Sequence, residues 1–319
     1  MILFYRLGCM FLTILCLNAC FEPNYESHHL TRISGGFDPT RYEPPPPPPI
    51  NPGDKVPTEI TFSMTPYFSP EVHRNIVTPI AQHLEKELSI PVVIKEAETY
   101  RDLINYTINN EVDVALISPL AFVLAKEENP KIELLAAVVA QGTTTYSGYL
   151  VTPTQSEIIT IADAKNKRLA LVDPVSTSGS LFPKLFFQQQ NIVAETFFSE
   201  IIYTGTHDKA LSLIRENKVD LAAVSSDTLV GYNALGPGGF VRIVANTGRA
   251  PYDALVASSQ IPPWLRAYIK TIFLRLSIHT QEGRAILSKK NLLSGFIPVN
   301  ESHYKTVKAA AQAGGLIKK

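Results

Sequence analysis

The chain has 319 residues, and its 29 Lys and Arg residues balance 29 Asp and Glu residues, so the formal net charge at pH 7 is zero. This balance argues against a general electrostatic attraction to nucleic acid or to an anionic lipid surface, so any anion site must be built locally. The three cysteines, Cys9, Cys16 and Cys20, all precede residue 21. The rest of the chain therefore has no disulfide framework, thiolate nucleophile or cysteine-based metal site.

Residues 1–20 are predicted to be a secretory signal. Arg6 gives the only positive charge before the apolar run from Met10 to Leu17, which is too short to span a bilayer. The run leads into the letters LNAC, which resemble the bacterial lipobox, in which the cysteine is acylated and becomes the new N-terminus. We therefore expect a lipid anchor at Cys20 on the periplasmic face of a bacterial membrane; an ordinary signal peptide cut nearby is the alternative.

Residues 21–57 are predicted to be a proline-rich tether. They show no sustained apolar periodicity, and Pro44 to Pro49 form an uninterrupted proline run. Such a run forms a polyproline II rod of roughly 19 Å, at about 3.1 Å per residue. A spacer is the favoured interpretation, and a docking ligand for another protein is the alternative. Phe21 follows the cysteine where inner-membrane retention would favour an Asp, so inner and outer membrane both stay open.

From Thr58 onward, short apolar strands alternate with helices. The first strand is expected at residues 60–64, and Ser69 with Pro70 predicts the start of a helix that continues to Leu88, kinked or restarted at Pro79. Further strands are expected at residues 92–94, 113–117, 134–139, 148–151, 168–172, 201–203 and 220–224, and further helices at 102–110, 179–190, 263–276, 281–289 and 304–312. This alternation predicts an α/β fold with mostly parallel sheets, and two such series of strands predict two lobes.

A hydroxyl-rich turn follows the strand expected at residues 168–172. Ser176, Thr177 and Ser178 precede Gly179, where a helix is expected to begin. Free backbone N–H groups and the helix dipole make such a start an anion site, to which each hydroxyl can add a donor. Simple capping of the helix by Ser or Thr is the alternative interpretation.

A second turn of the same design follows the strand expected at residues 201–203. The letters GTHD, residues 205–208, lead into a helix that continues to Asn217, with His207 in its first turn. A neutral imidazole can donate one hydrogen bond to an oxyanion, although a single histidine at a helix start is often only a surface residue. The other six histidines show no metal-ligand spacing on a shared element, so no metal site is expected.

Taken together, the two turns resemble the phosphonate-binding family of ABC transporter solute-binding proteins, which carry an STSG turn followed at a similar separation by a G-S/T-H-D turn. Further likeness lies in YSG at residues 146–148, in VDVA at 112–115 followed by Ser118 and Pro119, and in GFIPV at 295–299. The resemblance covers about residues 58–312. It implies a type II periplasmic binding protein fold with an interlobe cleft, one lobe from residues 58–150 plus 250–319 and the other from 151–249.

The resemblance also implies which residues bind the ligand. Members hold a phosphorus oxyanion with the STSG hydroxyls and amides, here Ser176, Thr177 and Ser178, together with the histidine of the second turn, His207. Two cleft tyrosines of the family match Tyr100 and Tyr146, and Ser118 could offer one more donor; for both tyrosines, packing at a lobe edge is the alternative.

A carboxylate near an aminoalkyl ligand's ammonium would correspond to Asp227, with Asp253 as a weaker candidate, and either could be only a solvated cap. The chain departs from the family at Phe122, where an aromatic hydroxyl is common, and this leaves the polar half of the ligand open.

The function that the resemblance implies is capture of a small phosphonate, phosphite or phosphate and its delivery to an ABC importer, without a cofactor and without catalysis. A sensor lipoprotein of the same fold, which reports its ligand to a signalling kinase or receptor, is the alternative, and neighbouring genes would distinguish the two. An enzyme on this fold would need a nucleophile or base pair, and one cleft histidine in a chain without later cysteines does not supply it.

Overall fold

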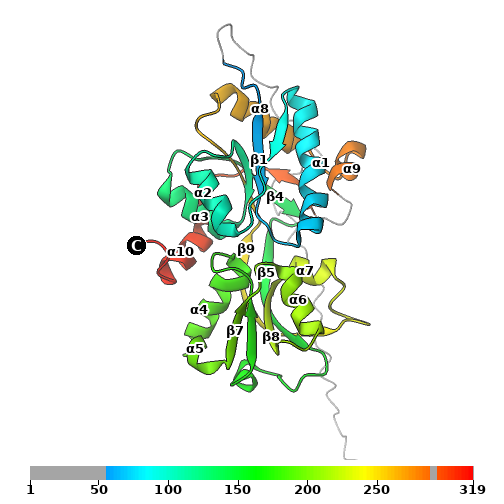
Figure 1. The fold of residues 1–319 in the computed structure, drawn as a ribbon, viewed down its shortest axis with the longest axis vertical. Helices are drawn as coiled ribbons and strands as arrows, with labels where there is room; N and C mark the ends of the chain where they lie inside the picture. Colours follow the sequence, from blue (N-terminus) through cyan, green and yellow to red (C-terminus); the bar gives the residue numbers. More distant parts are fainter. Residues whose placement is uncertain (1–54, 288–292, 319) are drawn as a thin grey trace, which may run out of the picture.

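The computed structural model describes residues 55–287 and 293–318. The predicted signal segment, the lipidation position Cys20 and nearly all of the predicted tether lie outside the described residues. The described part forms two β-sheets that follow one another along the long axis of the molecule, with helices beside each (Figure 1). No helix in this described part is long and apolar enough to cross a membrane.

The first sheet has six strands in the order β11-β4-β10-β3-β1-β2. They are β1 (Ile60–Met64), β2 (Val92–Ile94), β3 (Val114–Ile117), β4 (Glu133–Ala140), β10 (Ala254–Ala257) and β11 (Leu293–Ile297). The helices in this part are α1 (Pro70–Leu88), α2 (Tyr100–Ile108), α3 (Pro119–Glu128), α8 (Pro263–Arg275), α9 (Gln281–Leu287) and α10 (Lys305–Ala313), the last after a 3-10 turn at Glu301–Tyr304.

The second sheet has five strands in the order β7-β6-β8-β5-β9. They are β5 (Thr145–Pro153), β6 (Arg168–Leu171), β7 (Glu200–Tyr203), β8 (Leu221–Ser225) and β9 (Val241–Pro251). Its helices are α4 (Phe182–Gln189), α5 (Ala194–Phe197), α6 (His207–Arg215) and α7 (Ser226–Gly231), with a 3-10 turn at Ile161–Ala164 and a π-type turn at Thr177–Leu181.

The strand pairing corrects the expectation of mostly parallel sheets. β2, β1 and β3 pair in parallel in the first sheet, as do β7, β6 and β8 in the second. Every other pairing is antiparallel among the described strands. For four of these five pairings the physical reason is that the chain crosses between the sheets twice, from β4 to β5 and from β9 to β10. β5 and β10 each enter the new sheet in the direction opposite to their neighbours, whereas the edge pair β11–β4 forms without a crossing.

We propose that each sheet is the centre of one lobe. β5 belongs to the second sheet from Thr145 onward, and β9 stays in it up to Pro251. The two crossings therefore lie near residues 144 and 252, a few residues from the expected boundaries at 150 and 250.

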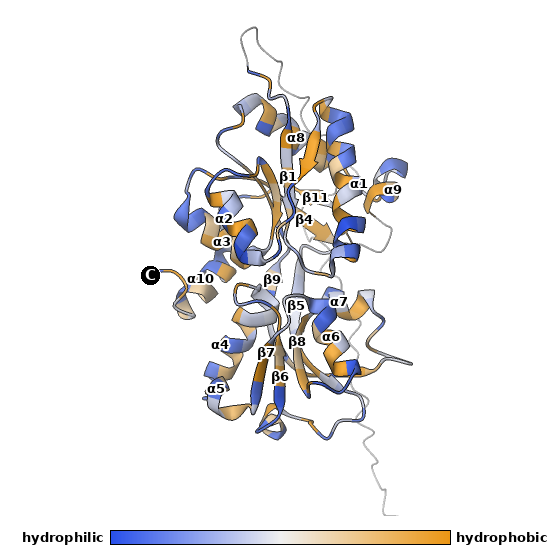
Figure 2. Cartoon of the chain, in the orientation of Figure 1, coloured by the Kyte–Doolittle hydropathy of each residue, from blue (hydrophilic) through white to orange (hydrophobic). Residues whose placement is uncertain are grey.

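Burial follows the apolar pattern of the sequence. The four residues of β3 are all buried, and α1 turns Ile76, Ile80 and Leu84 toward the first sheet. Figure 2 shows the same division, with apolar strands inside each lobe and hydrophilic surfaces on the helices. α1 continues without interruption through Pro79, so of the two alternatives at this proline the restart is wrong.

Candidate functional site

A cavity of about 630 Å³ lies between the two sheets. Its polar lining includes all eight residues expected to bind the ligand: Tyr100, Ser118, Tyr146, Ser176, Thr177, Ser178, His207 and Asp227. Tyr100 and Ser118 come from the first sheet's side, whereas the STSG turn and His207 follow strands β6 and β7 of the second sheet. The cavity thus lies at the carboxyl ends of parallel strands, where open α/β sheets bind ligands.

The STSG turn begins the π-type turn that leads into α4. Ser176 Oγ accepts a hydrogen bond from the Gly179 amide at 3.1 Å, and the Leu181 amide donates to the Ser176 carbonyl oxygen at 3.0 Å. Among the described residues, the amides of Thr177 and Ser178 donate to no other group. A π-type turn is frequent at functional sites, and two free amides at its start are ready donors for an anion.

Gly179 lets the turn fold back onto Val172, the residue directly after β6. A Cβ atom at this position would come within 2.5 Å of the Val172 side chain and 2.8 Å of Ser176 Oγ. Glycine is therefore required by the close approach of the Val172 and Ser176 side chains, and not by an unusual backbone angle.

Replacing Gly179 by alanine should disturb both the turn and its contact with β6. We expect Gly179→Ala to lower the free energy of unfolding by about 1–3 kcal/mol, because an added methyl overpacks a filled space. Denaturant unfolding of the variant measures this loss. The control is Gly314→Ala, where the new Cβ would come closest to the end of the Leu181 side chain, at 3.0 Å, and would lie 3.4 Å from the Ala310 carbonyl oxygen. Equal losses in the two variants would contradict the close-packing requirement at Gly179.

Hydrogen bonds connect segments that belong to the two sheets around the cavity. Thr177 Oγ1 accepts from the Leu120 amide at 2.9 Å, which joins the STSG turn to the start of α3. The His207 amide donates to the Tyr67 carbonyl oxygen at 3.0 Å, and the Ser69 amide donates to Asp208 Oδ2 at 2.9 Å. The second turn is therefore held against the segment between β1 and α1.

Two buried hydroxyl groups from the first sheet's side have no hydrogen-bond partner. Tyr100 is 1% exposed and Ser118 is 3% exposed, and neither Tyr100 Oη nor Ser118 Oγ makes a hydrogen bond within the described residues. Burial raises the pKa of Tyr100, and the nearby Asp173 carboxylate raises it further by a smaller amount. The nearby Ser176 side chain slightly lowers this pKa, although its position relative to Tyr100 Oη does not have the geometry of a hydrogen bond. An unpaired buried polar group is costly, so both hydroxyls are available to bond a group that enters the cavity.

His207 is a neutral donor. Its Nδ1 accepts a hydrogen bond from the Ser225 amide at 3.3 Å, so the proton of the neutral ring resides on Nε2. Burial lowers the pKa of His207 to about 4, while Asp208 slightly opposes this change. The expected imidazole donor is present, and its charge is zero at neutral pH.

Tyr146 lies at the start of β5 and stacks on Tyr252, with 5.2 Å between the ring centroids. Burial raises its pKa, so the hydroxyl remains a protonated donor. Two residues later, a Cβ atom at Gly148 would come within 3.1 Å of the Ser178 Cβ. The YSG letters therefore place a tyrosine beside the STSG turn and leave room for the turn itself.

Two carboxyl groups lie on the cavity wall without a cationic partner. Asp227 Oδ1 accepts from Tyr252 Oη at 2.8 Å and from Gln141 Nε2 at 2.7 Å, and Asp253 accepts from Tyr67 Oη. Burial raises the pKa of Asp227 to about 6 and that of Asp253 to about 7, with the hydrogen bonds opposing both changes. No Lys or Arg is among the described lining residues.

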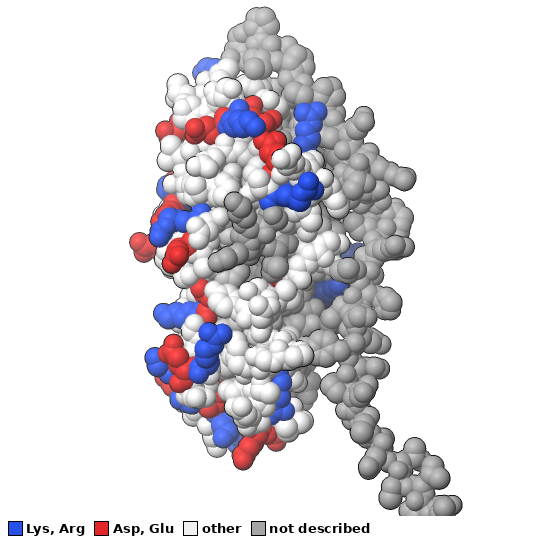
Figure 3. Space-filling view, turned by 90° about the vertical axis from the view of Figure 1, so that its right-hand side faces the viewer, with Lys and Arg blue, Asp and Glu red and all other residues white. Residues whose placement is uncertain are grey.

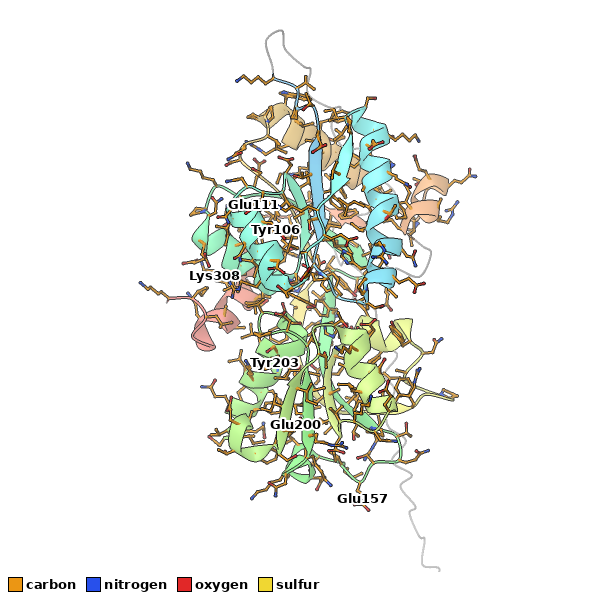
Figure 4. The ribbon with its side chains drawn as sticks, in the orientation of Figure 1. Tyr106, Glu111, Glu157, Glu200, Tyr203 and Lys308 are labelled. Atoms are coloured by element: carbon orange, nitrogen blue, oxygen red, sulfur yellow. The ribbon has the colours of Figure 1, made fainter. Side chains whose placement is uncertain are left out.

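Charged groups lie instead on the outer surface. Figure 3 shows basic and acidic side chains intermixed over one face, without a large area of one sign. Tyr106 and Tyr203, labelled in Figure 4, do not line the cavity, and Lys95 and Lys184 sit over their rings. An anion in the cavity would thus be held by neutral donors, as the balanced composition suggested.

Sequence reasoning missed part of the lining. Tyr67 and Tyr252 contact the two carboxyl groups, yet neither belongs to a motif of the resemblance. The signal for Tyr67 was its position just after the carboxyl end of β1, where ligand contacts concentrate. Phe122, expected near the ligand, lies instead in the core against Tyr304, with 4.7 Å between ring centroids. Its lack of a hydroxyl therefore does not bear on this cavity.

One group of side chains outside the cavity has metal-like geometry. His83, Glu87 and Glu282 bring potential ligand atoms within 4.8 Å of one another at the surface. The first two are four residues apart on α1, so the expectation that no other histidine has metal-ligand spacing on a shared element is wrong for His83. Glu282 Oε1 already accepts a hydrogen bond from Lys86 Nζ at 2.7 Å, so this carboxylate is neutralised by an ammonium group and the cluster indicates no metal site.

Comparison with known proteins gives a consistent family. The model of the family described as "ABC transporter, phosphonate, periplasmic substrate-binding protein" matches residues 62–304. The "Phosphate-import protein PhnD" of Mycolicibacterium smegmatis is 25% identical over 279 residues, which cover 81% of this chain and 87% of that protein. The "Phosphonates-binding periplasmic protein" of Escherichia coli is 25% identical over 218 residues, 66% of this chain and 64% of that protein.

Solved structures share the fold. PhnD1 from Prochlorococcus marinus (MIT 9301), in complex with methylphosphonate, has a TM-score of 0.73 at 19% identity, over 82% of this chain and 100% of that one. A binding protein component of a phosphonate ABC transporter from Pseudomonas aeruginosa gives the same TM-score and identity, over 81% and 86%. The expected type II periplasmic binding protein fold is confirmed.

Proposed function

This chain belongs to the periplasmic substrate-binding proteins of phosphonate ABC transporters, and from this premise we propose that the cavity between its sheets binds the oxyanion of a phosphonate. The donors are the amides of Thr177 and Ser178, the hydroxyls of the STSG turn, Nε2–H of His207, and the hydroxyls of Tyr100, Tyr146 and Ser118. The chain then presents the ligand to the permease of an ABC importer. Lipid attachment at Cys20, outside the described residues, remains part of this proposal.

The observation that carries the proposal is the pair of unpartnered buried hydroxyls that line the same cavity as two free amides and one imidazole N–H. Each of these five groups is a hydrogen-bond donor or can become one, and the five groups come from both lobes. Hydrogen bonds to a charged group contribute about 1.5–3 kcal/mol each. Five or six of them suffice for submicromolar binding after the cost of association.

Binding requires the lobes to separate and close. The interlobe hydrogen bonds of Thr177, His207 and Asp208 enclose the donors. The crossings near residues 144 and 252 are the only two covalent connections between the sheets in the described part of the chain, so we propose a hinge there. Once the lobes close, each hydrogen bond to the oxyanion is shielded from water and gains strength.

Titration calorimetry with the purified chain tests this function. Methylphosphonate, 2-aminoethylphosphonate, phosphite and phosphate are the ligands to compare, since the mycobacterial relative is named for phosphate import. The proposal predicts submicromolar binding of at least one phosphonate. If none of the four ligands releases or absorbs heat on mixing, the proposed function is wrong.

Tyr100→Phe is expected to affect stability and binding in opposite directions. Removing an unpartnered buried hydroxyl should raise the free energy of unfolding of the empty protein by about 1 kcal/mol. Affinity for methylphosphonate should fall about tenfold, because one donor is lost. Thermal unfolding without ligand measures the free energy of unfolding, and calorimetry with methylphosphonate measures the affinity.

The matched control is Tyr304→Phe. Tyr304 is equally buried, but its hydroxyl donates to the Tyr252 carbonyl oxygen at 3.0 Å. Loss of that made hydrogen bond should lower the free energy of unfolding by about 1 kcal/mol. If Tyr100→Phe behaves like this control and leaves affinity unchanged, the Tyr100 hydroxyl does not await a ligand.

Asp227 is the proposed partner for an ammonium group on the ligand. Asp227→Asn should weaken binding of 2-aminoethylphosphonate about tenfold relative to ethylphosphonate, because only the first ligand gains a charge-assisted hydrogen bond. The measurement is calorimetry at pH 8, above the raised pKa of about 6, where the carboxylate is ionised. If Asp227→Asn changes the affinity for both ligands equally, Asp227 only accepts hydrogen bonds from Tyr252 and Gln141 and does not bind the ammonium group.

A further inference from the structure

The cavity is larger than a small phosphorus oxyanion needs. Its volume of about 630 Å³ would hold roughly 20 water molecules at about 30 Å³ each. Phosphite or methylphosphonate would replace only a few of these. A volume of this size lies within the range of roughly 300–1,000 Å³ that encloses larger organic ligands.

The space beyond the proposed oxyanion donors has apolar walls. Its lining includes the following side chains from strands β1, β3 and β4, from α1 and from the segment just before it: Met64, Phe68, Val72, Ile76, Leu116, Val138 and Ala140. We call these seven residues the apolar chamber. They lie at the carboxyl end of the first sheet and under the first turns of α1, on the opposite lobe from the STSG turn.

The two carboxyl groups of the cavity wall, Asp227 and Asp253, are not members of the apolar chamber. Asp227 already accepts from Tyr252 and Gln141, and Asp253 accepts from Tyr67. Phe68 and Val72 are half-buried, and the other five residues of the chamber are at most 5% exposed. A small polar ligand at the STSG turn would therefore leave mainly the Phe68 and Val72 side chains as apolar surface in contact with water. Burying apolar surface is favourable in proportion to its area, so a ligand that fills the chamber gains affinity that a small one cannot.

We infer that the ligand is an organophosphonate with an apolar substituent of about four carbon atoms or more, whose phosphonate group meets the STSG turn and whose substituent fills the apolar chamber. This inference depends on the proposed phosphonate-binding function and specifies its substrate class. Each methylene group that moves from water into the chamber raises affinity by about fourfold. Inorganic phosphate and phosphite are then poor ligands because they have no substituent.

The test is calorimetry of the purified chain with methyl-, butyl- and phenylphosphonate. We expect butyl- and phenylphosphonate to bind at least about tenfold more tightly than methylphosphonate. Flat or falling affinity from methyl to butyl and phenyl would overturn the inference while leaving the proposed function intact. Absence of binding by every phosphonate would overturn both.

Filling the chamber gives a second test. In Val72→Phe, the larger ring occupies part of the chamber, so affinity for butylphosphonate should fall about tenfold more than affinity for methylphosphonate. The matched control is Val93→Phe, the same change at a side chain that is 45% exposed on β2 and does not line the cavity. If the ratio of the affinities for butylphosphonate and methylphosphonate is the same in Val72→Phe and Val93→Phe, the substituent does not lie in the apolar chamber.

Discussion

His207→Ala is expected to raise the dissociation constant for a phosphonate about 100-fold at pH 7.5. The variant loses the Nε2–H donor, and the Ser225 amide loses its acceptor at Nδ1. A hydrogen bond from a buried neutral group to an anion contributes about 1.5–3 kcal/mol, and every 1.4 kcal/mol corresponds to a factor of ten. Calorimetry of the two proteins at several pH values is the measurement.

The pH profile separates this explanation from a charged histidine. Because burial lowers the pKa of His207 to about 4, the ring stays neutral from pH 5.5 to 8, and the ratio of the two dissociation constants should be constant over that interval. His279→Ala, at an exposed position outside the cavity, is the control and should bind like the parent protein. If the ratio of the dissociation constants of His207→Ala and the parent protein grows as the pH falls through 6.5, His207 does not act as a neutral donor.

Asp253→Asn should stabilise the empty protein at neutral pH. The raised pKa of Asp253, about 7 against an ordinary 3.8, means that the folded state keeps a proton that the unfolded state loses. Stability of the parent protein is therefore unaffected by Asp253 below about pH 4 and falls as the pH rises toward 7. A shift of about three pKa units corresponds to about 4 kcal/mol. Asparagine does not ionise and can still accept from Tyr67, so the variant escapes this loss.

The measurement is the difference in free energy of unfolding between variant and parent at pH 4 and pH 8. Buried histidines with a lowered pKa, such as His73, have the opposite pH dependence, but they are present in both proteins and cancel in the difference. Asp163→Asn serves as control. Hydrogen bonds from the Thr160 amide and neighbouring groups lower the pKa of Asp163, so ionisation of this carboxyl group changes the free energy of unfolding only at more acidic pH. A difference for Asp253→Asn that does not grow with pH would mean that Asp253 is ionised in the folded protein.

Much of the fold could be predicted from the sequence because local patterns and the resemblance agreed. The four-residue apolar spacing after Ser69 and Pro70 identified α1, and the apolar letters at residues 113–117 identified a fully buried strand. The two helix beginnings could be predicted to converge because each follows one of two paired parallel strands, β6 and β7. Parallel neighbours end at the same edge of a sheet, so the STSG turn and His207 had to lie close together.

The rest depended on contacts between distant segments. Antiparallel pairing of β10 with β3 and β4 follows from the two crossings between the sheets, which no local pattern reveals. The tautomer of His207 depends on the Ser225 amide, 18 residues away in the chain. The apolar chamber combines side chains from β1, β3, β4 and α1 that look like ordinary core residues in the sequence. Its existence follows only from how α1 lies over the first sheet.

A crystal structure of the purified chain with methylphosphonate is the most direct measurement of whether the two turns share one anion. We expect the phosphonate oxygens to lie within hydrogen-bond distance of the Thr177 and Ser178 amides and of His207 Nε2, with Tyr100 Oη and Ser118 Oγ as further donors. A phosphonate bound elsewhere, with the Tyr100 and Ser118 hydroxyls still unpartnered, would contradict it.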